Sequence, residues 1–208
     1  MRSLTFLILG ALAACSSGGD SSASPPPANS GLTVIGAIQG SGAASPMAGQ
    51  SVALEAVVTG DFQDNDSDAT RNLGGFYVQG AADGNAATSD GIFIFDGNSP
   101  STDVKAGDIV RVEGTVKEFF GETQVEASTV TVIGSGSVQA TPVSLPAGDL
   151  ERYEGMRIEF QQTLTVSQLR NFERYGEMRL SEGGRQYAYT NLNGPSGTGF
   201  SQHLDDVA

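Results

Sequence analysis

Hydrophobic and polar residues alternate along two long stretches of the chain. In residues 51–62 an apolar side chain stands at nearly every second position, and residues 108–119 repeat the alternation. A period of two places successive side chains on opposite faces of a β-strand, so both stretches are predicted to be half-buried strands. The side chains expected on the buried faces are Val52, Leu54, Ala56, Val58, Val110, Val112, Gly114 and Val116.

Three shorter runs, rich in β-branched and aromatic residues, predict further strands at residues 74–79, 91–96 and 123–133. Turn-forming residues separate the five runs, and no convincing amphipathic helix is expected between Gly31 and Pro146. Five strands in about a hundred residues, with glycines inside the strand patterns, favour an OB-fold-like small barrel. This domain is expected over residues 31–148, with a β-sandwich as the alternative.

A polar loop joins the strands expected at residues 74–79 and 91–96, and it holds Asp83 and Asp90. Aspartates in such loops accept hydrogen bonds from nearby backbone N–H groups. We therefore interpret both as loop-forming residues in preference to metal ligands.

A second unit is predicted at residues 149–208, after the boundary marked by Pro142 and Pro146. It repeats the order of the first unit, but about sixty residues are too few for a complete barrel. The expected fold class is therefore all-β, an OB-fold-like small barrel followed by a second, incomplete OB-like unit that is truncated or borrows strands from a partner. Its expected elements are a helical turn at 150–155 and strands at 156–168, 176–181 and 185–191.

The N-terminus has the pattern of a lipoprotein leader. Arg2 precedes an apolar run too short to span a bilayer, and small residues lead from that run to Cys15. This resembles a bacterial lipobox and predicts a signal peptide over residues 1–14 and a membrane anchor through lipid on Cys15; an ordinary cleaved signal peptide is the alternative. Ser16 after the cysteine, in place of Asp, favours the outer membrane over retention at the inner one. The expected location is therefore the cell envelope, as an outer-membrane lipoprotein, or extracellular. Residues 15–30, rich in Ser, Gly and Pro, predict a disordered tether.

The charge of the chain restricts what it binds. The formal net charge is −13, from 24 acidic and 11 basic residues, and such a chain repels polyanions at long range. Residues 31–148 hold 14 acidic and 4 basic residues, whereas residues 149–185 hold 7 and 6. If DNA binds, phosphate contacts are therefore expected in the second unit, with an ordinary solvated surface as the alternative. The candidates are Arg152, Arg157, Arg170, Arg174, Arg179 and Arg185.

OB-folds stack bases on aromatic side chains in a groove that also carries cations. Several aromatic residues of the expected strands suit this role, although they equally suit the barrel core, which is the alternative. The candidates are Tyr77, Phe93, Phe95, Phe119 and Phe120, with Arg111 and Lys117 as nearby cations.

An acidic loop after the first long strand is a candidate Ca²⁺ site. Asp64, Asp66 and Asp68 stand at alternate positions, Asp61 precedes them, and Ca²⁺ prefers such oxygen ligands. The EF-hand template fails, because no Gly follows at the sixth position and no Glu at the twelfth. A solvated acidic turn is the alternative.

The chain also carries an ordered series of segments: GGFYVQ, TSDGIFIF, GDIVRVEGTVKEFFGETQ, SLPAGDLERYEGMRI and NFERYGEMRLSEGGRQYAYTN. Their order and spacing, nearly continuous over residues 34–193, resemble the N-terminal half of ExeM/NucH-type extracellular endonucleases. The resemblance implies YhcR-like OB-fold modules here and a metal-dependent domain of the endonuclease/exonuclease/phosphatase type, with Mg²⁺ or Ca²⁺, after residue 208.

No catalytic residue of that family has a matching position in this chain. Metal-assisted phosphodiester hydrolysis in the family uses histidines and carboxylates, whereas this chain holds one histidine, His203. The chain alone is therefore expected to be non-catalytic and to require no cofactor.

Two classes of function remain. The first is the N-terminal region of a surface-anchored nuclease, which presents extracellular DNA to a downstream catalytic domain or docks on that domain in cis. The second is a stand-alone envelope lipoprotein whose OB-folds bind protein or polysaccharide. A reading frame that continues past Ala208 into a nuclease domain separates the two.

Overall fold

A computed structural model of the chain contains two compact units. The barrel unit comprises residues 20–159, and the C-terminal unit comprises residues 160–208 together with residues 1–19. The division follows Glu159, later than the boundary before Asp149 that the sequence suggested. The structure describes residues 6–7, 31–63, 72–175, 177–193 and 199–201. Within these ranges no helix has the length and hydropathy needed to cross a membrane.

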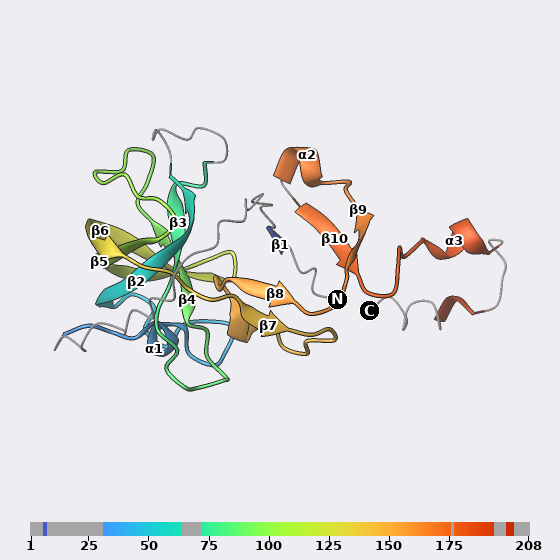
Figure 1. Ribbon diagram of the computed structural model, residues 1–208, viewed down its shortest axis with the longest axis horizontal. Helices are drawn as coiled ribbons and strands as arrows, with labels where there is room; N and C mark the ends of the chain where they lie inside the picture. Colours follow the sequence, from blue (N-terminus) through green and yellow to red (C-terminus); the bar gives the residue numbers. More distant parts are fainter. Residues whose placement is uncertain (1–5, 8–30, 64–71, 176, 194–198, 202–208) are drawn as a thin grey trace, which may run out of the picture. The chain divides into compact units, whose positions relative to one another are not determined.

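Five strands of the barrel unit close into a barrel (Figure 1). They are β2 (Ser51–Phe62), β3 (Gly75–Gln79), β4 (Gly91–Phe95), β5 (Asp108–Phe119) and β6 (Glu122–Ser135). Their order around the barrel is β2-β3-β4-β6-β5, with β4 and β6 parallel and the other neighbouring pairs antiparallel. This five-stranded Greek-key barrel is the OB-fold, so the expected fold class is confirmed.

The barrel interior is filled by the faces that the alternation predicted. Leu54 and Val58 of β2 and Val110, Val112 and Val116 of β5 are at most 1% exposed. The shorter strands complete the core with Phe76, Val78, Ile92, Ile94 and Val125, none of which is exposed. Because side chains alternate across each strand, the neighbouring residues necessarily face outward and are available for other contacts.

One short helix was not expected from the sequence. Helix α1 (Ile35–Gln39) precedes the barrel and contacts β4, and it buries Ile35 and Ile38. The buried Gln39 Nε2 donates a hydrogen bond to the Gly91 carbonyl oxygen at 2.6 Å. A single turn is too short to show a helical period, so only its packing on the barrel reveals it.

The loop between β3 and β4 is built as the sequence suggested. The Asp90 Oδ1 atom accepts a hydrogen bond from the backbone N–H of Asp83, and the Asp83 carboxylate accepts from Asn85 N and Thr88 Oγ1. Burial raises the pKa of Asp90 above its usual range. These bonds close the loop on itself, so both aspartates have structural partners.

The last part of the barrel unit packs against the start of β4. It contains β7 (Thr141–Val143), the 3-10 turn η1 (Glu151–Tyr153) and the first two residues of β8 (Ile158–Phe160), and β7 pairs with β8. The turn confirms the helical turn expected here. A Cβ atom on Gly91 would lie 2.4 Å from the Gly155 carbonyl carbon, so the two backbones approach as closely as glycine allows.

In the C-terminal unit, β9 (Thr165–Gln168) and β10 (Glu177–Ser181) form an antiparallel pair, and β1 (Phe6–Leu7) adds to β10. Two short helices follow β9 and β10, α2 (Phe172–Tyr175) and α3 (Tyr189–Leu192). Two expectations fail here. The strand expected over 156–168 is split into β8 and β9, and 185–191 contains no strand. The chain there instead enters α3, where the Tyr189 ring is buried against Phe200 at a centroid distance of 5.4 Å.

Candidate functional site

A hollow of about 510 Å³ opens on the outer surface of the barrel. It lies over β3, β4 and the hairpin of β5 and β6, which correspond to the second, third, fourth and fifth strands of an OB-fold. The face of strands two and three, beside the loop between strands four and five, is where OB-folds bind oligonucleotides and oligosaccharides. The residues that line the hollow are Leu73, Tyr77, Phe93, Phe95, Lys117, Glu118, Phe119, Glu122, Gln124 and Glu126.

Tyr77, Phe95, Phe119 and Phe120 are not buried, so the alternative that the aromatic candidates fill the barrel core is wrong for these four, whereas Phe93 is only 5% exposed. Tyr77, Phe93 and Phe95 alternate along β3 and β4 with the side chains that point inward. The Tyr77 and Phe93 rings pack at a centroid distance of 4.8 Å, and Phe62 meets Tyr77 edge-on at 5.9 Å. The packed Tyr77 and Phe93 rings therefore form an apolar wall of the hollow.

Carboxylates accompany the aromatic wall. The Tyr77 hydroxyl donates a hydrogen bond to Glu122 Oε1 at 2.8 Å. Burial raises the pKa of both groups, and the nearby Glu122 charge raises that of Tyr77 further. Lys117 Nζ lies 3.6 Å from Glu126 Oε2, so the ammonium group that lines the hollow is already neutralised by a carboxylate.

A second set of polar contacts ties the hairpin to the segments around it. Glu118 Oε1 accepts hydrogen bonds from Ser45 N at 2.7 Å and from Thr123 Oγ1 at 2.8 Å. Glu154 Oε1 accepts from Thr123 N at 2.9 Å, and its backbone oxygen accepts from Ser89 Oγ at 2.6 Å. Burial, strengthened by the charges of Glu151, Glu122 and Glu118, raises the pKa of Glu154 to about 8.

The tip of the β5–β6 hairpin presents two aromatic rings beside the hollow. Phe119 is 56% exposed and Phe120 is 98% exposed, and their rings meet edge-on at a centroid distance of 4.7 Å. Phe120 has φ 52° and Gly121 has φ 88°, the left-handed pair that a tight hairpin turn requires. Asn or Asp is the usual residue before Gly in such a turn, and a Phe in this conformation is strained.

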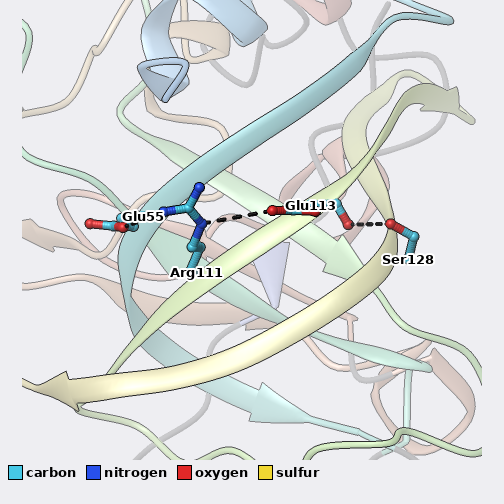
Figure 2. A network of polar contacts seen from close by, with 4 residues as sticks. All are labelled: Glu55, Arg111, Glu113 and Ser128. Atoms are coloured by element: carbon cyan, nitrogen blue, oxygen red, sulfur yellow. Dashed lines mark hydrogen bonds and ion pairs between the residues drawn. The ribbon is translucent and has the colours of Figure 1, made fainter. Parts of the chain in front are cut away.

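Arg111 lies apart from the hollow. Its guanidinium Nη1 is 3.4 Å from Glu55 Oε1 of the neighbouring strand, and its Nε is 3.8 Å from Glu113 Oε1 (Figure 2). The backbone oxygen of Glu113 accepts a hydrogen bond from Ser128 Oγ at 3.0 Å, which links β5 to β6. Arg111 is therefore held in a cross-strand ion pair, and it does not line the hollow.

The remaining arginine candidates also lie outside the lining of the hollow. In the barrel unit, the Arg152 guanidinium stacks on the Tyr153 ring at 4.8 Å, and the backbone N–H of Arg157 donates to Gln79 Oε1 at 2.9 Å. In the C-terminal unit, Arg185 stacks on Tyr187 at 5.5 Å. Arg170 and Arg179 are exposed, and the side chain of Arg174 lies outside the described part of the chain.

The candidate Ca²⁺ loop falls mostly outside the described residues. Asp61 is the penultimate residue of β2, and its Oδ1 accepts a hydrogen bond from Gln63 N at 3.2 Å. Asp64, Asp66 and Asp68 lie in the undescribed range 64–71. Among the described ranges, no group of three His, Cys, Asp or Glu residues is arranged to hold a metal ion. Cys15, the tether and His203 also lie outside the described residues.

The carboxylates of the hollow were missed in the sequence analysis. Glu122, Gln124 and Glu126 occupy alternate positions of β6, on the face opposite the buried Val125. The same alternation that identified the core therefore also marked these residues as neighbours on one outer face. Their position beside Tyr77 and Phe93 depends on the pairing of β4 with β6, which a single strand pattern does not reveal.

Comparison with known proteins adds little to this geometry. No family model and no curated protein matches the chain. One similar solved structure is the hypothetical protein ygiW from E. coli, at 12% sequence identity and a TM-score of 0.30, over 41% of this chain and 77% of that one. The OB-fold assignment rests on the strand order of the barrel itself.

Proposed function

We propose that this chain is the non-catalytic N-terminal region of a surface-anchored extracellular nuclease, and that its barrel is a binding module. One observation carries the binding proposal. An apolar hollow with polar groups at its rim lies over the strand face and the hairpin that OB-folds use for ligands. The nuclease context rests on the ordered sequence segments described above. The proposed lipid anchor rests on the lipobox-like pattern that ends at Cys15.

Within this proposal, docking on a protein domain fits the hollow better than direct presentation of DNA. Three glutamates line the hollow with a single lysine, and that lysine is paired with Glu126. Phosphate groups need uncompensated cations, and carboxylates at the same surface repel them. If this chain contacts DNA, the exposed Arg170 of the C-terminal unit is a candidate for the phosphate contact.

A stand-alone envelope lipoprotein that binds polysaccharide is the second candidate. The hollow combines aromatic rings with carboxylates and the amide of Gln124, groups that can stack on sugar rings and accept hydrogen bonds from hydroxyl groups. The reading frame beyond Ala208 separates the candidates. A following His- and Asp-rich nuclease domain supports the first, and an immediate stop codon would favour the second.

Binding at the hollow is tested with the full chain carrying Cys15→Ala, so that no lipid is added. Fluorescence anisotropy is measured with three labelled probes: a single-stranded DNA oligonucleotide, a β-glucan oligosaccharide and a short basic peptide. For whichever probe binds, we expect Phe119→Ala to lower the affinity about tenfold, as expected for an aromatic anchor of an interface. Arg111→Gln, which alters a charge outside the hollow, is the matched control. Binding that is unaffected by Phe119→Ala contradicts the assignment of the hollow as the binding site.

A further inference from the structure

The hollow has an excess of negative charge over an electron-rich aromatic surface. Glu118, Glu122 and Glu126 line it with Lys117, whose Nζ lies 3.6 Å from Glu126 Oε2. Aromatic faces attract cations through their quadrupole, and carboxylates attract them through their charge. Both features therefore select a cationic group over a phosphate or a neutral one.

The hairpin tip beside the hollow offers apolar surface that a bound molecule can cover. Phe120 is 98% exposed and Phe119 is 56% exposed. Phe120 also adopts φ 52°, a conformation that Asn or Gly would adopt with less strain. Backbone strain at an exposed apolar residue is a feature of binding sites, where a contact with another molecule accounts for it. A second molecule that covers the Phe119 and Phe120 rings supplies such a contact.

We propose that the hollow and the Phe119–Phe120 tip together dock a basic polypeptide segment. An Arg or Lys side chain of the segment enters the hollow between the aromatic wall and the carboxylates of Glu122 and Glu126, and apolar side chains of the segment cover the two rings. Charge complementarity and the exposed rings together favour a polypeptide with both features, which neither a neutral or acidic polysaccharide nor a nucleic acid offers. The inference rests on the proposed binding module and names its ligand class.

The test uses the full chain carrying Cys15→Ala and a short fluorescein-labelled peptide in which Arg alternates with Leu. The matched probe replaces each Arg with citrulline, which has nearly the same shape but no charge. We expect the citrulline peptide to bind about tenfold more weakly, because it loses the cation–π and carboxylate contacts. Equal affinity for the two peptides would overturn the inference.

Two variants connect this selectivity to the hollow and its tip. The Glu126 side chain is 53% exposed, and Glu126→Gln should lower the affinity for the Arg peptide about fivefold. The Glu113 side chain is 55% exposed and lies outside the hollow, so Glu113→Gln should leave that affinity unchanged. Phe120→Asn should weaken binding while the melting temperature stays the same or rises, because Asn suits the left-handed turn. Equal losses in the Glu126 and Glu113 variants would indicate general charge attraction and contradict the inference.

The remaining outcomes separate this inference from the proposed function. If DNA or the β-glucan binds and Phe119→Ala abolishes that binding, the binding module stands and the basic polypeptide is wrong. If no probe binds in a manner that depends on Phe119, both the inference and the binding module are overturned.

Discussion

The barrel unit and the C-terminal unit differ in how much apolar surface their strands bury. In the barrel, two strands of 12 residues and one of 14 wrap a cluster of buried aliphatic side chains around Phe76. In the C-terminal unit, β9 and β10 have four and five residues, and Val166 and Leu169 are 44% and 54% exposed. Among the described residues after Phe160, Tyr189 is the only buried hydrophobic side chain. Long alternating strands that close on themselves therefore build a core, whereas short strands in an open sheet bury little.

The largest expected effect lies in the barrel core. Leu54 is 1% exposed, so Leu54→Ala removes buried methyl groups and leaves a cavity. We expect the free energy of unfolding of the barrel unit to fall by about 3 kcal/mol. Urea denaturation followed by circular dichroism measures this loss. An effect below about 1 kcal/mol would mean that the barrel tolerates the cavity and that its core differs little from the C-terminal unit.

The next effect lies where the end of the barrel unit packs on β4. Gly91→Ala places a Cβ atom 2.4 Å from the Gly155 carbonyl carbon, and one of the two backbones must move. We expect a loss of about 2 kcal/mol, typical of overpacking. Gly134→Ala in β6 is the matched control, because its Cβ would meet no atom closer than 3.7 Å. Similar losses in both variants would show that glycine replacement in a strand, and not this close approach, sets the cost.

A pH-dependent effect is expected at the same contact. Burial raises the pKa of Glu154 from 4.5 to about 8, so the folded chain keeps this proton while the unfolded chain has lost it. The contribution of protonated Glu154 to the free energy of unfolding is therefore complete below pH 4.5, and it is lost as the pH rises towards about 8. Glu154→Gln, which keeps the acceptor for Thr123 N, should flatten this part of the stability profile. Thermal melting between pH 4 and 9 measures it, with the exposed Glu182→Gln as the control. Parallel wild-type and Glu154→Gln profiles would contradict the raised pKa.

The smallest effect is expected in the C-terminal unit. Leu169→Ala repeats the chemistry of Leu54→Ala at a side chain that is 54% exposed. We expect a change within about 0.5 kcal/mol, because little buried surface is lost. Measured by the same denaturation experiment, a loss as large as that of Leu54→Ala would show that Leu169 is covered in solution and would remove the contrast between the two units.

The strands of the barrel were predictable because their alternation is long. Residues 51–62 and 108–119 each offer several consecutive inward positions, and all of the side chains expected to be buried are buried. Helix α1 and the segment 185–191 were not predictable in this way. Helices α1 and α3 have five and four residues, too few to repeat the helical period, so packing decides the conformation of both segments.

The candidate site was half predictable for a related reason. Tyr77, Phe93, Phe95 and Lys117 were chosen for their residue types and all line the hollow, whereas Arg111 was chosen on the same grounds and is paired with Glu55 elsewhere. Residue type identifies a side chain that can bind. It does not show which charged partner already lies within reach.

The sequence by itself determined the all-β class, the inward faces of the long strands and the acidic character of the chain, because these depend on local alternation and composition. Only the tertiary structure decided that the aromatic residues face outward beside Glu122 and Glu126. That arrangement requires β4 to pair in parallel with β6, a contact between residues distant in the chain that no local pattern encodes. The same pairing brings Glu122, Gln124 and Glu126 to the hollow beside the predicted aromatic residues.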